Sequence, residues 1–379
     1  MEKKKVFYLL TAMRIGGTEK AFLGLLSTID YSKTEVHVGL FHKDGALLSY
    51  LPKEVFVDHI ALDPELMGND NIPTSSAIKL YLRRKQPFRA IVLSILYIAS
   101  LLNKKYRYLI FRYVLKEVPV FKTHFEEAYA FSGINELVTF YVAEKISAET
   151  KVCWIHFDVA KEPLTRPFFI HEMNYFQRIH LVSQQAKQSF DGVFPSLAGK
   201  SVFVPNIVLR EQIIALSESG CTFEDGYDGT RLLTIARMSP EKGIPDALQA
   251  LRALRQAGIQ IRWYFIGSGP RMEEYKKLAH KLDVAGDAVF LGSIVNPYRY
   301  LKDCDIYVQP SKGEGFCIAI TEAICLDKPI VATDFSGARE QLTGRKDSLI
   351  IGMHAPTLAA GIRTMMQHLH SSPTIKDFS

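Results

Sequence analysis

The second half of the chain alternates apolar runs, glycine-containing turns and amphipathic segments, and this alternation limits the possible folds most strongly. Short apolar runs bounded by turn residues predict buried strands, and the longer segments between them predict helices. The expected strands span residues 231–236, 261–266, 289–291, 305–310, 330–333 and 348–351. Strands and helices that alternate in this way form a parallel sheet covered by helices on both faces. We therefore expect an α/β domain with a doubly wound parallel sheet over residues 208–379.

The first half, residues 1–207, shows the same alternation less regularly. It opens with a buried strand over residues 6–12, which breaks at Gly16 and Gly17 before a helix. Further strands are expected at residues 35–41, 55–60, 128–132, 151–157, 180–183 and 201–206. A strand, a glycine turn and a helix form the first unit of a nucleotide-binding fold. We expect two Rossmann-like domains that face a cleft, and we interpret the polar residues 217–230 as the best linker candidate.

The composition is that of an ordinary globular protein, with 47% hydrophobic and 23% charged residues among 379. The formal net charge of +6 is too small to indicate a nucleic-acid partner. The five cysteines are scattered without a Cys-x-x-Cys pair, which indicates a reducing cytosol and argues against disulfides or a zinc site. The apolar run after Lys5 is too short for a signal peptide, and no stretch reaches the length of a transmembrane helix. We expect a cytoplasmic protein.

Residues 77–122 differ from the rest of the chain in charge, with eleven Lys or Arg residues against a single acid, Glu117. Between them lies an apolar run, residues 90–102, which is too short to span a bilayer and suits a buried or an interfacial helix. Two interpretations remain open: the helices pack into the core with solvated charges, or they rest on an anionic membrane. Basic residues that flank apolar helices are typical of an interfacial anchor, and they favour the inner face of the cell membrane.

Two carboxylates eight positions apart, Glu314 and Glu322, accompany the turn after the expected strand 305–310. In open parallel sheets, ligands bind at the carboxyl ends of strands, and a following helix offers N–H groups to a polar or anionic ligand. Glu314 would stand at the mouth of this crevice, and Glu322, about two helical turns on, could face the same side. In the alternative interpretation both are surface helix residues, since Glu is a good helix former and is rarely buried.

Cations and glycines follow the neighbouring expected strands. Arg237 and Lys242 flank the turn after strand 231–236, where two fixed cations suit a diphosphate. The next turn carries Gly267 and Gly269 without the third glycine of a dinucleotide fingerprint, and the chain has no Walker-type phosphate loop.

Other polar residues have simpler interpretations. His156 ends a strand, a position of interest in an α/β sheet, although on its own it is better interpreted as a structural histidine. Asp303 and Asp305 have the spacing of a metal–nucleotide clamp but precede their strand, away from the carboxyl-end crevice, and we interpret them as structural. No metal site is expected in the sequence.

Taken together, several motifs resemble a known family. The segments that carry this resemblance are 237–243 (RMSPEKG), 265–270 (FIGSGP), 290–292 (FLG), 314–323 (EGFCIAITEA) and 328–334 (KPIVATD). They resemble family 4 of the retaining GT-B glycosyltransferases, and residues 16–19, His156 and residues 204–206 extend the resemblance over nearly the whole chain. Within that family the chain is similar to bacterial enzymes that build capsular and other cell-surface polysaccharides.

The resemblance implies a role for each catalytic candidate. Arg237 and Lys242 would hold the donor diphosphate and stabilise the leaving group without a metal or other cofactor. Glu314 would grip the donor sugar, and His156 would lie beside the sugar and the acceptor.

The resemblance also implies a set of donor-binding residues. The expected donor contacts are Gly16, Gly17, Gly267, Gly269, Ile294, Phe316, Cys317, Ile318 and Glu322. Within this set, Glu322 would bind the ribose, the turn at Ile294 would contact the base through its main chain, and residues 316–318 would donate backbone N–H groups. Cys317 departs from the family, which often has Gly or Pro there, so the sugar's identity cannot be transferred.

These features predict a glycosyltransferase that moves a hexose from a nucleotide diphosphate sugar, with a UDP-linked donor expected, and with retention of anomeric configuration. The expected acceptor is a lipid-linked cell-surface glycan reached from an anionic membrane surface. Two rivals remain: a nucleotide-sugar epimerase on the same scaffold, and a non-catalytic subunit that binds nucleotide sugar within a membrane complex.

Overall fold

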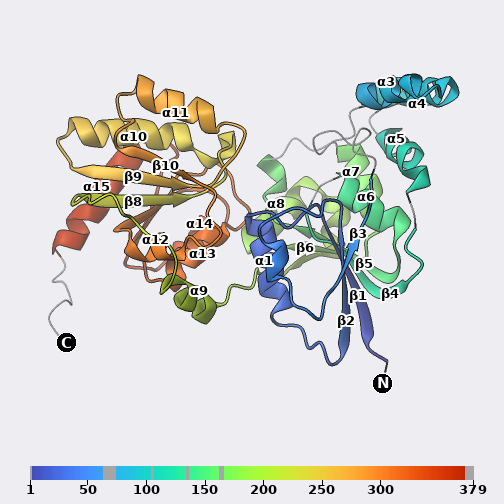
Figure 1. Ribbon diagram of the computed structural model, residues 1–379, viewed down its shortest axis with the longest axis horizontal. Coiled ribbons are helices and arrows are strands. Elements are labelled where there is room, and N and C mark those ends of the chain that lie inside the picture. The colour runs from blue at the N-terminus through green and yellow to red at the C-terminus, as the bar shows by residue number, and fades with distance from the viewer. Residues whose placement is uncertain are drawn as a thin grey trace. The chain divides into compact units, whose positions relative to one another are not determined.

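The computed structural model describes residues 2–62, 74–103, 106–118, 120–133, 136–161 and 166–371 (Figure 1). Internal contacts divide the chain into two units. The first comprises Met1–Arg14 and Thr18–Pro205, and the second comprises Ile15–Gly17 and Asn206–Ser379. The sequence places the domain boundary between residues 207 and 208. Each unit is built on one parallel sheet.

The first unit has a seven-stranded sheet within the described residues, in the order β3-β2-β1-β4-β5-β6-β7. Its strands are β1 (Lys4–Leu10), β2 (Thr34–Leu40), β3 (Phe56–His59), β4 (His124–Ala130), β5 (Ser147–Ile155), β6 (Arg178–Leu181) and β7 (Ser201–Phe203). Its helices are α1 (Gly17–Leu26), α3 (Thr74–Arg83), α4 (Pro87–Leu102), α5 (Arg107–Val114), α6 (Glu136–Lys145), α7 (Arg166–Met173) and α8 (Gln184–Val193). The strand order reverses between β1 and β4, which places a topological switch point there.

The second unit has a six-stranded sheet within the described residues, in the order β10-β9-β8-β11-β12-β13. Its strands are β8 (Thr230–Ile235), β9 (Ile261–Ile266), β10 (Ala288–Gly292), β11 (Ile306–Gln309), β12 (Ile330–Thr333) and β13 (Ser348–Ile351). Its helices are α9 (Arg210–Ser217), α10 (Ile244–Gln256), α11 (Met272–Lys281), α12 (Tyr298–Asp303), α13 (Ile318–Cys325), α14 (Ala338–Leu342) and α15 (Ala355–Ser371). The strands expected from the sequence are confirmed in both units, and so is the doubly wound parallel architecture.

Helices cover both faces of the second sheet because its strands are apolar on both sides. On one face, Leu248 of α10 and Leu358 of α15 pack with Trp263 of β9. On the other face, Leu301 of α12 and Ile320 of α13 pack in a separate apolar cluster. Figure 1 shows α10 and α11 on one side of this sheet and α12 and α13 on the other. This burial of apolar surface on two faces is the main stabilising term for such a sheet.

The interpretation of residues 217–230 as a linker is wrong, because this segment lies inside the second unit. The carboxylate of Asp225 accepts hydrogen bonds from Arg231, from Arg262 at 2.7 Å and from the Tyr264 hydroxyl at 2.5 Å. These three charged or polar partners fix a polar stretch whose composition alone indicates a loop. The structural interpretation of Asp303 is confirmed, since it accepts hydrogen bonds from Thr222 and Arg299.

Asp305 is also structural, because its carboxylate accepts a hydrogen bond from the backbone N–H of Arg231 at 2.7 Å. This bond joins the start of β8 to the residue before β11, at the amino ends of both strands. Neither aspartate lies at the carboxyl ends, where ligands bind.

The basic and apolar stretch of residues 77–122 forms most of α3 and all of α4 and α5. In α4, Ala90 and Leu93 are buried, whereas Phe88 is 76% exposed and Ile95 is 59% exposed. We call the exposed side chains of α4 the apolar stripe, and define it as Phe88, Ile91, Ile95, Ile98 and Leu102. Their spacing of three and four positions places them on one face of the helix. No helix among the described residues is long and apolar enough to cross a membrane.

Candidate functional site

The candidate site lies at the topological switch point of the second sheet, where β8 and β11 run side by side. The turn after β8 carries Arg237 and Lys242, and the turn after β11 carries Ser311 and Glu314. Because both strands are parallel, these turns meet at the same edge of the sheet. This is the edge at which open α/β sheets bind their ligands.

Lys242 and Glu314 form an ion pair across this switch point, with 2.6 Å between Lys242 Nζ and Glu314 Oε1. Their side chains are only 17% and 14% exposed. Burial lowers the pKa of Lys242, but the Glu314 carboxylate, together with Cys317 and Glu241, raises it, and the pKa ends above its ordinary value. Lys242 is therefore a fixed cation, and the interpretation of Glu314 as a surface helix residue is wrong.

A buried chain of hydrogen bonds holds Glu314 from behind. The Tyr307 hydroxyl donates to Gln309 Oε1, Gln309 Nε2 donates to Ser311 Oγ at 2.8 Å, and Ser311 Oγ donates to Glu314 Oε1 at 2.9 Å. Thr333 Oγ1 donates to the Ser311 carbonyl at 2.5 Å. All four supporting side chains are nearly inaccessible to solvent, so the Glu314 carboxylate is held in one place.

These supporting residues are not among those predicted from the sequence, although their spacing indicates them. Tyr307, Gln309 and Ser311 are spaced by two, which puts their side chains on one face of the strand. Polar residues at that spacing in an otherwise apolar, buried strand predict a hydrogen-bonded row, because buried polar groups need partners.

Two glycines allow the turns to approach each other. At Gly243 φ is +67°, and a Cβ there would overlap the carbonyl oxygen of Pro310 at the end of β11. At Gly267 φ is +136°, and a Cβ would overlap the carbonyl oxygen of Ala236. The backbone N–H of Lys312 also donates to the Glu241 carbonyl at 2.7 Å. Glycine is required at both positions by the backbone itself.

The second glycine of the predicted pair, Gly269, also packs closely, because a Cβ there would overlap the backbone of Met238. Met238 N donates to the Ser268 carbonyl at 2.9 Å, so the turns after β8 and β9 are bonded to each other. The turn after β10 joins them, because Gly267 N donates to the Gly292 carbonyl at 2.7 Å. Three carboxyl-end turns thus form one continuous backbone surface.

Arg237 lies apart from the Lys242–Glu314 pair. Its guanidinium donates to Glu241 at 2.9 Å and to Ser239 at 3.3 Å, and its side chain is 68% exposed. The structure therefore brings Lys242 and Glu314 together. It leaves Arg237, on the same turn after β8, as an exposed cation outside the pair. An exposed pair of this kind contributes little to stability, so it can exchange partners at low cost.

Glu322 occupies a different environment from Glu314. It is 2% exposed, and its Oε1 accepts a hydrogen bond from the hydroxyl of Tyr298 at 2.8 Å. Tyr298 belongs to α12, which follows the turn at Ile294, and Ile294 itself is partly buried in the same apolar cluster. The interpretation of Glu322 as a surface residue is wrong, and no pattern in the sequence indicates Tyr298 as its partner.

The turn between Glu314 and α13 carries the three predicted N–H donors. Cys317 is the N-cap of α13 and has φ +68°, a left-handed conformation that is uncommon for residues other than glycine. The Phe316 carbonyl accepts a hydrogen bond from Gln341 Nε2, which ties this turn to α14. The first N–H groups of a helix generally lack partners within the helix, although in α13 Ile320 N donates to the Cys317 carbonyl at 3.1 Å.

Burial dominates the environment of His156 in the first unit. Burial lowers its pKa to about 4, and its ring stacks near Phe131 and Trp154. His156 is therefore a neutral imidazole at neutral pH.

Gly16 and Gly17 follow β1 at the switch point of the first sheet, and neither has a positive φ. The backbone conformation therefore does not explain why glycine occurs there. Their predicted contact with the donor stays a prediction.

Comparison with known proteins agrees with this geometry. Residues 227–371 match the family model described as glycosyl transferases group 1. An uncharacterized glycosyltransferase of Methanocaldococcus jannaschii is 26% identical over 248 residues, which cover 60% of this chain and 60% of that protein. A Campylobacter jejuni protein is 27% identical over 138 residues, which cover 36% of this chain and 37% of that protein. Its name is N-acetylgalactosamine-N,N'-diacetylbacillosaminyl-diphospho-undecaprenol 4-alpha-N-acetylgalactosaminyltransferase. The chain therefore spans at most about 60% of the length of these relatives.

The fold comparison extends over both units. The crystal structure of Anabaena HepE in complex with UDP and glucose superposes with a TM-score of 0.67, at 16% identity, covering 97% of this chain and 91% of that one. The fold is thus GT-B, and the resemblance to bacterial GT-B glycosyltransferases is confirmed.

Proposed function

We propose that this protein is a retaining glycosyltransferase that moves a hexose from a UDP-linked donor to a lipid-linked glycan. The observation that carries the proposal is the buried Lys242–Glu314 pair at the switch point of the second sheet. It lies inside the segment that matches the group 1 glycosyl transferases. HepE, which shares the fold, is described in complex with UDP and glucose, and this supports the choice of base and sugar class.

The leaving group sets the chemical demand. As the glycosidic bond breaks, negative charge grows on the departing diphosphate, and fixed cations stabilise that charge without reorganising. Lys242 is held in place by Glu314, and Arg237 is exposed and can leave Glu241 for a phosphate oxygen. Glu314 then has a hydroxyl-binding role at the donor sugar. We propose that these two cations serve in place of a metal or other cofactor.

The remaining donor contacts follow from the same arrangement. Glu322 would hydrogen-bond the ribose, with its carboxylate oriented by Tyr298. The N–H groups of residues 316–318 would approach the donor at the N-terminus of α13. His156, as a neutral imidazole, would donate or accept a hydrogen bond at the sugar or the acceptor hydroxyl.

The acceptor is proposed to be reached at a membrane surface. The apolar stripe on α4 is exposed, and basic residues of α3 and α5 flank it. An amphipathic helix with this composition binds at the interface of an anionic bilayer. The Campylobacter jejuni relative is named for a diphospho-undecaprenol substrate, which supports a lipid-linked acceptor.

The donor proposal is tested by thermal stabilisation of the full-length protein with UDP-, GDP- and dTDP-linked hexoses, each with EDTA present. A ligand at about 100 times its Kd stabilises the folded state by about 2.7 kcal/mol. We expect stabilisation by a UDP-linked sugar that is weakened in Glu322→Gln. Stabilisation by none of these donors would contradict the proposed site.

The membrane proposal is tested separately by sedimentation with vesicles of phosphatidylglycerol and phosphatidylcholine. We expect binding that requires phosphatidylglycerol and weakens with added salt, because salt screens surface charge. Reversing the charges of Arg83, Arg84 and Lys85 should abolish this vesicle binding and leave the thermal stabilisation by the donor unchanged. Lys104 and Lys105, which the sequence also implicates, lie outside the described residues. Equal binding to neutral vesicles would refute the electrostatic part, and no binding would indicate a soluble acceptor.

A further inference from the structure

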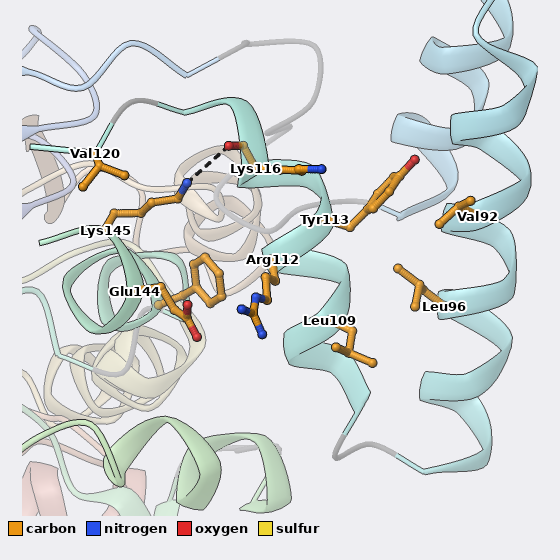
Figure 2. Close-up of a pocket in the computed structure, with 10 residues that line it drawn as sticks. Val92, Leu96, Leu109, Arg112, Tyr113, Lys116, Val120, Glu144 and Lys145 are labelled. Carbon is orange, nitrogen blue, oxygen red and sulfur yellow. Dashed lines mark hydrogen bonds between the residues drawn. The ribbon is translucent and has the colours of Figure 1, made fainter.

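A cavity of about 550 Å³ lies between α4, α5 and α6 of the first unit (Figure 2). Its apolar walls come from Val92 and Leu96 of α4, Leu109 of α5 and Phe140 of α6. Figure 2 shows Val92 and Leu96 facing α5 from the inner side of α4. The volume lies within the range of pockets that hold small ligands, and such pockets are also mostly apolar with few polar groups.

The polar groups of the cavity are mainly cationic. Arg112, Lys116 and Lys145 line it, against one acid, Glu144. Lys145 Nζ donates to the carbonyl oxygens of Lys116 at 3.4 Å and Val118 at 3.1 Å, so it holds one end of the cavity in place. Arg112 and Lys116 are exposed at the rim. The surplus of positive charge suits an anionic head group beside an apolar chain.

The cavity and His156 lie at opposite ends of the first sheet. Lys145 ends α6 just before β5 begins, and Val120 lies just before β4 begins. The cavity is therefore at the amino ends of these strands, whereas His156 lies at the carboxyl end of β5. A ligand in the cavity would not reach His156.

The cavity shares a wall with the proposed membrane-binding surface. Val92 and Leu96 lie on the inner side of α4, and the apolar stripe lies on its outer side. A lipid acyl chain that leaves a bilayer beside the apolar stripe would pass from one apolar surface of α4 to the other without crossing much water. This continuity points to a membrane lipid as the occupant.

We propose that the cavity binds one anionic phospholipid of the membrane, with an acyl chain against Val92, Leu96 and Leu109 and the phosphate between Arg112 and Lys116. The proposal deepens the membrane docking described under the proposed function and rests on it for the source of the lipid. Lipid binding there would hold α4 and α5 against the body of the first unit.

The test uses the full-length protein and water-soluble short-chain lipids below their micelle concentration, measured by calorimetry. We expect dihexanoyl phosphatidylglycerol to bind, dihexanoyl phosphatidylcholine to bind at least tenfold more weakly, and inorganic phosphate not to bind. Val92→Trp fills the cavity and should weaken phosphatidylglycerol binding at least tenfold, whereas the matched control Val92→Ala should retain it.

A second pair of variants keeps the proposal testable if Val92→Trp fails to fold. Arg112→Gln with Lys116→Gln should lose phosphatidylglycerol binding, and the control Lys79→Gln with Lys85→Gln, which neutralises two cations outside the cavity, should keep it. Donor stabilisation by a nucleotide sugar should stay unchanged in all variants. Equal binding by the parent and the Arg112/Lys116 variant, or equal binding of the two lipids, would overturn the proposal.

Failure of the cavity is distinguishable from failure of the docking proposal. Ile91→Ser, Ile95→Ser and Ile98→Ser together remove the stripe, and this variant should lose vesicle binding yet keep short-chain phosphatidylglycerol. If the parent binds vesicles but no short-chain lipid, the cavity proposal is wrong and docking stands. If the parent binds the short-chain lipid but no vesicle, docking is wrong and the cavity stands.

Discussion

Removing the charge of Lys242 should lower both the stability of the protein and its rate of sugar transfer. A second substitution, Glu314→Gln, should restore the stability and leave the transfer rate low. The Glu314 side chain is 14% exposed. Lys242→Met removes the cation beside it and leaves Ser311 as its side-chain hydrogen-bond donor among the described residues. Met matches the length of the lysine stem without its charge. In Lys242→Met with Glu314→Gln, neither an uncompensated cation nor an uncompensated anion remains.

The magnitude follows from the geometry of the pair. Two charges about 3 Å apart attract by about 5 kcal/mol at an effective dielectric constant of about 20, and desolvation of both ions offsets much of this. Breaking a fully buried pair costs about 3–5 kcal/mol. Because both side chains keep some exposure, we expect Lys242→Met to cost about 2–3 kcal/mol, a Tm decrease of about 5–10 °C for a unit of this size.

The assay combines thermal unfolding with sugar transfer for the parent, both single variants and the double variant. We expect the double variant to recover most of the lost Tm and none of the lost transfer, since the leaving-group cation is still absent. Losing one such fixed donor typically costs about 3–4 kcal/mol in the transition state. Recovery of transfer together with stability would refute the role of Lys242 at the diphosphate, and an additive loss of stability would refute the ion pair.

Three further predictions concern single residues of the two units. Glu322→Gln should raise the donor KM with little change in kcat, whereas Glu314→Gln should mainly lower kcat; identical profiles would contradict separate roles for ribose and sugar. Cys317→Gly should be at least as stable as the parent and Cys317→Val clearly less stable in thermal unfolding, because a β-branched residue at φ +68° is strained; equal Tm values would show that the turn relaxes. In the parent, His156 has a folded pKa of about 4, so the stability that it contributes above pH 6.5 is lost as the pH falls toward 4, by about 3 kcal/mol. His156→Phe should remove this contribution and flatten the pH dependence of the unfolding free energy. His180, whose pKa burial also lowers to about 4, should leave a similar decline in that variant, and an unchanged profile would place the His156 ring in solvent.

The strands were predictable because their apolar runs end at turn residues, and those of β12 and β13 match the structure residue for residue. The starts of β1 and β4 were not predictable from apolar pattern. Lys4 and Lys5 belong to β1 because Lys4 pairs with Glu127 at 2.9 Å and Lys5 N donates to Glu126. Polar residues join a strand here because a neighbouring strand supplies their partners, and the sequence of one strand does not contain that information.

The site was predictable as a set of turns and not as a set of contacts. The parallel alternation places Lys242 and Glu314 at one edge of a sheet, but their ion pair depends on β8 lying next to β11. Strand order is a tertiary property that local periodicity does not encode. The same limit applies to Tyr298, whose hydrogen bond to Glu322 joins α12 and α13 on one face of the sheet.

The anomeric configuration of the product tests the central claim most directly. The full-length protein is incubated with an α-linked UDP-hexose, EDTA and an isoprenoid diphosphate glycan acceptor, and the new linkage is assigned by NMR, with Glu314→Gln as the slow control. The account predicts an α-linked product that forms at an undiminished rate with EDTA and far more slowly with Glu314→Gln. A β-linked product, or full transfer by Glu314→Gln, would contradict it.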